Sequence, residues 1–298
     1  MWFRNLRFYR FEEPFTLDAR QLNEALLGRQ ARGCGQMEMA CEGWEKPLGR
    51  NGQQLVHETD GNLMLRLRRE AKVLPASLVR ELVEMKVAEI EEQTGRTVGR
   101  KEKTEIKEQL LSELLPRALV KATHSYAYID RKSGWLIVDA GSSAKAEELI
   151  ALLRKTLGTL SVVLPQTGLS PEDVMTRWLS DDRTLPAGFA LEDECELYAS
   201  GEHGGVVRCK SMDISADEVR AHLAQGKRVR KLALNWQERV SFVLQEDLSL
   251  RRLKFDDATQ EARGDTGGDP AAEFDADFAI MGAEIRELLP ALMAAMND

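Results

Sequence analysis

The chain has 298 residues, with 43% hydrophobic and 30% charged residues and a formal net charge of −8. It is long enough to bury a core without disulfides or metal ions, and its composition excludes a disordered tail, a collagen and a disulfide scaffold. No apolar run approaches the roughly 20 residues that a membrane-spanning helix needs.

The predicted elements of the first part of the chain are separated by clear turn signals. Residues 2–11 are rich in aromatic side chains and predict a strand, and the capping box at 18–21 predicts the start of a helix. The dipeptide Asp60-Gly61 predicts a hairpin turn. In the strand that follows, apolar side chains alternate with a second set that contains Arg66 and Arg68.

A helical hairpin is predicted over residues 76–116. Pro75 sits where a helix can begin, a glycine-containing segment at 95–100 interrupts the pattern, and Pro116 ends it. The apolar stripes of both helices are narrow, and the segment is rich in Glu, Lys and Arg. Such stripes are typical of an element that faces a partner rather than a central core.

The rest of the chain mixes short strands with helices. Strands are expected at 126–129, 135–138, 206–210, 228–234, 240–244 and 250–255, and helices after Ser143, Ser170 and Ser215 and over 278–296. Residues 263–270 read as a flexible, glycine-rich linker. Because helices are inserted between antiparallel hairpins, the predicted fold class is α+β. We expect an N-terminal α+β domain (1–75 with 117–165), the hairpin arm (76–116) and a C-terminal α+β domain (166–298).

No recognised catalytic or cofactor-binding signature is present, and no cofactor is expected. The sequence lacks the glycine-rich nucleotide loops, the nucleophile elbow and the zinc-protease motif. Four cysteines and four histidines are scattered without ligand spacing, which predicts no metal site and reduced, buried thiols. Asp275 and Asp277 could bind Mg²⁺ as a nuclease pair does, although their spacing also suits the start of a helix.

The negative charge is concentrated at the C-terminus. Residues 256–298 hold 11 acids and 2 bases, so the other 255 residues have a net charge of +1. Within residues 1–255, three predicted strands place pairs of cations on the face opposite their apolar side chains. A fourth cluster of cations lies at the start of another predicted strand. Fixed cations of this kind bind phosphates, but the same pattern also occurs on sheet faces that are simply solvated.

The chain resembles the RdgC family of bacterial recombination-associated proteins over essentially its whole length. The residues that carry the resemblance are the segments 1–6, 9–10, 69–75, 114–118, 145–147, 151–155, 204–208, 231–236, 252–255 and 275–278. The chain departs from the family pattern at Ala144, at Ser211 and Met212, and at Leu119, where relatives often have an aromatic residue. These departures lower the local positive or aromatic content.

The resemblance implies a non-enzymatic, nucleoid-associated cytoplasmic protein that forms a ring-shaped homodimer. Such a ring would surround duplex DNA, with weaker binding of single-stranded DNA, and would oppose RecA by occupying the same DNA. The residues expected to contact phosphate are Arg66, Arg68, Lys72, Arg117, Arg208, Lys210, Lys227, Arg228, Arg230, Lys231, Arg252 and Lys254. Two alternatives stay open: a protein scaffold that acts on RecA directly, and a metal-dependent nuclease. The first ten residues also lack the apolar stretch of a signal peptide, in line with a cytoplasmic location.

Overall fold

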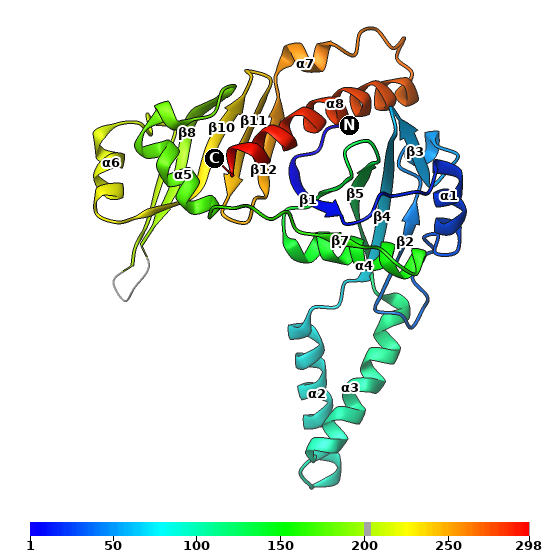
Figure 1. Cartoon of the computed structure of the whole chain (residues 1–298). Helices are drawn as coiled ribbons and strands as arrows, with labels where there is room; N and C mark the ends of the chain where they lie inside the picture. The colour runs from blue at the N-terminus through cyan, green and yellow to red at the C-terminus, as the bar shows by residue number, and fades with distance from the viewer. Residues whose placement is uncertain (200–203, 298) are drawn as a thin grey trace. The chain divides into compact units, whose positions relative to one another are not determined.

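The structure is a computed structural model that describes residues 1–199 and 204–297. It confirms the α+β class, with a large antiparallel sheet and helices inserted between its strands. The chain forms two compact units (Figure 1): unit 1 comprises Met1–Leu26, Lys46–Arg66 and Ser125–Asp298, and unit 2 comprises Leu27–Glu45 and Leu67–His124. The predicted hairpin 76–116 falls inside unit 2, and the predicted boundary at 165 falls inside unit 1. The three-domain division itself stays a prediction.

The strands and helices are bounded as follows. The strands are β1 (Asn5–Phe11), β2 (Ala40–Glu45), β3 (Val56–Thr59), β4 (Asn62–Lys72), β5 (Val120–Asp130), β6 (Trp135–Asp139), β7 (Val162–Val163), β8 (Phe189–Tyr198), β9 (Val206–Lys210), β10 (Arg228–Trp236), β11 (Val240–Gln245) and β12 (Leu250–Phe255). The helices are α1 (Ala19–Leu27), α2 (Ala76–Thr94), α3 (Arg100–Leu114), α4 (Ser143–Leu157), α5 (Pro171–Ser180), α6 (Asp217–Ala224), α7 (Asp257–Glu261) and α8 (Pro270–Ala295).

Unit 1 is built around a sheet in the order β4-β5-β6-β1-β12-β11-β10-β8-β9. Because side chains alternate along a strand, each face of this sheet has its own set of neighbours. On one face, apolar residues of β1, β10, β11 and β12 form a single buried cluster with α5 and α8. Around β1 the other face is also covered, since Tyr9 reaches Glu147 of α4 through a 3.0 Å hydrogen bond. Farther along, over β8 to β12, that second face is polar.

Unit 2 contains β2, the second half of β4, the beginning of β5 and the helical hairpin. Helices α2 and α3 lie side by side (Figure 1), and their small core consists of Val87, Val98 and Ile106. The turn between them is closed by Gly95, which has φ +67° and ends α2 as a left-handed cap. The predicted hairpin is therefore confirmed, as is its break at 95–100.

Several local expectations are confirmed by their hydrogen bonds. Asp18 and Gln21 form the predicted capping box, with bonds of 3.0 and 2.7 Å between each side chain and the other residue's backbone N–H. The Asp60-Gly61 turn joins β3 to β4, and both residues have positive φ.

Other boundaries differ from the predictions. Ser142, one residue before the predicted cap, accepts the capping bond of α4. No side chain caps α6, because Ser215 hydrogen-bonds Asp213 instead. Helix α8 begins at Pro270, eight residues early, since Asp269 caps it and proline suits the first helical position. Strand β8 was not predicted at all. Among the described residues, no helix combines the length and apolar content that a membrane crossing needs.

Candidate nucleic-acid interface

One face of the β8–β12 sheet in unit 1 is lined with charged side chains, and we call it the polar sheet face. Its register puts Lys210 opposite Glu194, and both Arg208 and Lys231 opposite Glu196. Farther across the sheet, Lys254 lies opposite Ser241 of β11. The charged residues of this face are Arg208, Lys210, Lys231, Arg252 and Lys254, with the carboxylates Glu192, Glu194 and Glu196.

The carboxylates of β8 neutralise part of this positive charge. Glu196 accepts hydrogen bonds from Arg208 at 2.8 Å and from Lys231 at 3.1 Å. Burial raises the pKa of Glu196, but these two bonds outweigh it and the net pKa lies below its ordinary value. Glu194 pairs with Arg252 at 2.5 Å and with Lys210 at 3.7 Å. The alternation of the sequence predicted the cations of this face but not strand β8, whose carboxylates pair with them.

The cations nevertheless remain open to solvent. The side chains of Arg208, Lys210 and Arg252 are 65%, 60% and 57% exposed. Lys254 is exposed as well and makes no ion pair with any described residue. Exposed cations at fixed positions on several strands can bind phosphates. On this face four cations are exposed and Lys231 is half-buried, and the five share the face with three carboxylates.

Three other predicted contacts lie elsewhere in unit 1. Arg228 pairs with Asp173 of α5, and Arg230 donates a 2.8 Å hydrogen bond to Glu246 while lying over the Tyr198 ring. Lys227 approaches His222 at the end of α6, at 3.2 Å. The structure therefore does not gather these three cations on the polar sheet face.

The remaining four predicted contacts come from β4 and the end of the hairpin. Arg66 lies over the Tyr126 ring, and Arg68 pairs with Glu45 at 3.0 Å and with Glu70. Lys72 is buried, and its ammonium donates to the carbonyls of Gln36 at 2.7 Å and Leu115 at 2.5 Å. Arg117 is exposed. Lys72 thus has a structural role, and we withdraw it from the set of phosphate contacts.

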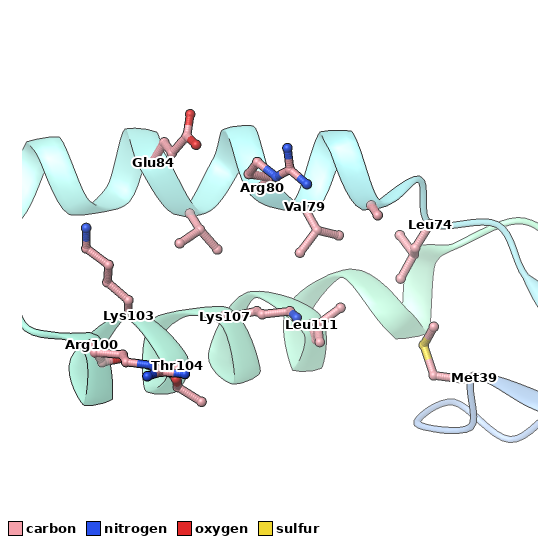
Figure 2. Close-up of a pocket in the computed structure, with 12 residues that line it drawn as sticks. Met39, Leu74, Val79, Arg80, Glu84, Arg100, Lys103, Thr104, Lys107 and Leu111 are labelled. Atoms are coloured by element: carbon pink, nitrogen blue, oxygen red, sulfur yellow. The ribbon is translucent and has the colours of Figure 1, made fainter.

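Unit 2 contains a cleft between α2 and α3 of about 610 Å³. Figure 2 shows Val79 pointing from α2 toward α3, and Lys103 pointing back from α3, with Met39 and Leu74 at the end where α2 begins. The cleft has an apolar floor and a rim of cations. These rim cations are Arg80, Arg100, Lys103 and Lys107. None of the four was among the predicted contacts, although Arg100, Lys103 and Lys107 are spaced three and four residues apart and so share one face of α3.

The two aspartates considered for a nuclease do not form a paired site. Asp275 hydrogen-bonds Thr59 and, at 2.9 Å, His57, whereas Asp277 is buried and pairs with the Met1 amino group and with Arg263 at 3.5 Å. Both lie inside α8 rather than at its start, because the helix begins at Pro270. Each carboxylate therefore ties α8 to a neighbouring segment of unit 1.

The structure brings together one group of potential metal ligands that the sequence analysis missed. The Sγ atoms of Cys34 and Cys41 are 2.9 Å apart, and a carboxylate oxygen of Glu38 lies within 4.8 Å of both. Burial, followed by the hydrogen bond with Cys34, raises the pKa of Cys41 to about 12. Cys195 and Cys209 are buried as predicted, but Cys34 and Cys41 are only partly buried. A seven-residue separation is no recognised ligand motif, so the sequence carried no signal for this group.

Comparison with known proteins places the whole chain in one family. A family model described as "Putative exonuclease, RdgC" matches residues 1–298. The recombination-associated protein RdgC of Aeromonas hydrophila is 46% identical over 298 residues, which cover 100% of this chain and 98% of that relative. Proteins of the same name from Tolumonas auensis and Psychromonas ingrahamii are 44% and 42% identical, with the same coverage. The chain therefore belongs to the RdgC family of recombination-associated proteins.

Proposed function

We propose that this protein binds duplex DNA without sequence preference, encircles it as a homodimeric ring, and restrains RecA-dependent recombination by occupying the DNA. The observation that carries the proposal is the polar sheet face, where exposed cations stand on strands β9 and β12 and the half-buried Lys231 stands on β10 between them. Association with the nucleoid in the cytoplasm follows from the same activity.

The chemistry of the polar sheet face favours phosphate contacts over base recognition. The positions between its cations on β10 and β11 are occupied by Ala233, Asn235, Ser241, Val243 and Gln245, none of which is aromatic. Stacking on single-stranded bases needs aromatic platforms, and specific readout needs an element that enters a groove. Phosphate binding fixes position without carrying sequence information. We therefore expect single-stranded DNA to bind through the same cations with lower affinity.

The hairpin unit supports the dimeric part of the proposal. A closed two-fold ring needs self-complementary contacts between the copies. Unit 2 exposes Leu119 to 79%, and it also offers the apolar cleft between α2 and α3. A leucine of one copy seated in the cleft of the other, with the reciprocal contact made at the same time, would satisfy the two-fold requirement.

The nuclease alternative has less support. The family description names an exonuclease, but among the described residues the acidic side chains Asp275 and Asp277 are engaged by separate partners. The ligand group at Cys34, Glu38 and Cys41 contains two thiols, whereas Mg²⁺ prefers oxygen ligands.

The test is fluorescence anisotropy of a random-sequence duplex titrated with the protein at several salt concentrations. We expect a plot of log affinity against log salt concentration to have a negative slope of several units. Each neutralised phosphate contributes about 0.9 to the size of that slope. Lys210→Glu and Lys254→Glu should each weaken binding and flatten the slope. Lys101→Glu is the matched control, since it reverses an exposed cation on α3 that does not line the cleft.

Three outcomes would count against the proposal. Absence of duplex binding at low salt would mean that the polar sheet face is only solvated. DNA cleavage in Mg²⁺ that Asp277→Asn abolishes would establish the nuclease. If the protein captures nuclease-treated RecA, and the Lys210 and Lys254 variants leave duplex affinity unchanged, a protein scaffold that acts on RecA directly would be favoured.

A further inference from the structure

The loop of residues 32–43 in unit 2 is closed tightly at its base. Ala31 N–H donates to the carbonyl of Trp44 at 2.8 Å, and Trp44 N–H donates to that of Arg29 at 2.9 Å. The two limbs are so close that a Cβ at Gly43 would lie 2.5 Å from the Ala31 Cα. Only glycine allows this approach without a backbone shift.

The tip of the loop is equally constrained, and this places two thiols against each other. Glu38 N–H donates to the carbonyl of Gly35 at 3.2 Å, and the Glu38 carboxylate accepts from Gly35 N–H at 2.8 Å. Arg32 holds both oxygens of the same carboxylate, at 3.0 and 2.5 Å. Between base and tip, Cys34 and Cys41 face each other with their sulfurs 2.9 Å apart.

We propose that Cys34 and Cys41 are a site of reversible oxidation, at which a hydroperoxide converts the two thiols into an intramolecular disulfide. The sulfurs are already in contact, both residues are accessible to solvent, and the closed loop keeps them together. A metal ion is the weaker candidate occupant, because Glu38 would have to give up its two-pronged ion pair with Arg32.

The chemistry balances with one equivalent of oxidant. One thiolate attacks a peroxide oxygen, the O–O bond breaks, and a sulfenic acid forms while the departing oxide takes a proton to become water or an alcohol. The second thiol attacks the sulfenic sulfur, so that the S–S bond forms and water leaves. The two sulfurs together supply the two electrons that reduce the peroxide. A cellular thiol reductant returns the pair to its starting state.

Oxidation would reach beyond the loop, because the loop is attached to β4 and to the hairpin. Cys34 N–H donates to Glu70 at 3.0 Å, and Lys72 N–H donates to the carbonyl of Met39 at 2.8 Å. Met39 also lines the end of the cleft between α2 and α3 (Figure 2). The disulfide would cross-link the segment that carries Met39 and so restrict how the end of the cleft can rearrange.

The second thiol pair of the chain is an internal control. Cys195 and Cys209 are direct partners across β8 and β9, but they are only 1% and 6% exposed. Because both of these sulfurs are enclosed, peroxide reaches them slowly. This pair should therefore stay reduced under conditions that oxidise the partly exposed Cys34 and Cys41.

The experiment exposes the reduced, metal-free full chain to one equivalent of hydrogen peroxide. The protein is then denatured in N-ethylmaleimide, and its intact mass and peptide map are recorded. We expect two of the four thiols to be blocked from alkylation, a peptide cross-linked between Cys34 and Cys41, and recovery of four thiols with dithiothreitol. Cys34→Ser and Cys41→Ser should abolish the cross-link, and Cys209→Ser should retain it.

Other outcomes would overturn the proposal. Four alkylated thiols after peroxide, or a cross-link found only between Cys195 and Cys209, would show that the pair is not oxidised. Conversion of Cys34 or Cys41 to sulfinic acid without a disulfide would show that oxidation does not join the two sulfurs. None of these readouts depends on DNA, so failure here leaves the proposed function untouched.

Discussion

Glu194 of β8 accepts a hydrogen bond from Arg252 of β12 at 2.5 Å, across the polar sheet face. The same carboxylate lies 3.7 Å from Lys210 of β9. One acidic side chain therefore holds two cations that would otherwise be free for phosphate. A nucleic acid must displace Glu194 from both of them, which lowers its net gain from each contact.

Neutralising this carboxylate should strengthen DNA binding. For Glu194→Gln we expect duplex affinity to rise about three- to fivefold, since exposed ion pairs are worth less than about 1 kcal/mol. The log–log salt slope should steepen by about one unit, the equivalent of one further phosphate. Anisotropy titrations at several salt concentrations measure both quantities.

The matched control for that change is Glu238→Gln. Glu238 is an exposed acid in the turn between β10 and β11, so its substitution alters net charge equally. If both variants strengthen binding to the same extent, the gain comes from overall charge and the specific role of Glu194 is wrong.

Lys72 provides a test of structural against DNA-binding roles. Its ammonium joins the loop carbonyl of Gln36 to that of Leu115, directly after α3. Lys72→Met keeps the length of the side chain but leaves both carbonyls without this donor, and should cost about 2–3 kcal/mol of unfolding free energy. Urea denaturation measures that loss. Duplex affinity at a temperature where the variant is folded should match that of the unchanged protein, and a clear drop would return Lys72 to the phosphate contacts.

The polar sheet face illustrates why the sequence predicted the fold better than the site. The cation pairs on β9 and β12 follow simple alternation and were found, but β8 was missed. In β8 the apolar residues Phe189, Leu191, Cys195 and Leu197 take alternate positions, but Asp193 breaks the series within a run of three acids. Register shifts also interrupt the pairing of β8 with β10. The strand whose carboxylates pair with the cations is thus one in which acids interrupt the apolar alternation.

The C-terminal helix and the thiol pair show two further kinds of miss. Asp269 and Pro270 are a recognisable helix start, but the glycines just before them dominated the interpretation of a linker. For Cys34 and Cys41 there was no local signal, because their contact depends on loop closure at Gly43. Contacts set by tertiary approach cannot be read from spacing alone.

Acid stability should depend on Asp60 in the β3–β4 turn. Hydrogen bonds from Lys132 and from Arg286 at 2.7 Å lower the pKa of Asp60 from 3.8 to about 2. Because the folded-state pKa is depressed, this contribution is present above about pH 4 and is lost as the pH falls toward 2. Asp60→Asn should lose less stability over that interval than the unchanged protein, as measured by urea denaturation at each pH. Equal losses in the two proteins would show that Asp60 does not contribute.

The proposed dimer contact at the hairpin can be tested through Leu119, whose exposure makes it dispensable for folding of the single chain. Leu119→Asp would place a carboxylate in an apolar cleft, and we expect the dimer dissociation constant to rise about tenfold or more. Sedimentation equilibrium measures this constant. Met85→Asp is the control, since Met85 is 62% exposed on α2 and does not line the cleft. If the dissociation constant is unchanged in Leu119→Asp, or rises equally in both variants, the cleft is not part of the interface. The two positions should differ only if Leu119 is seated in the cleft of the partner.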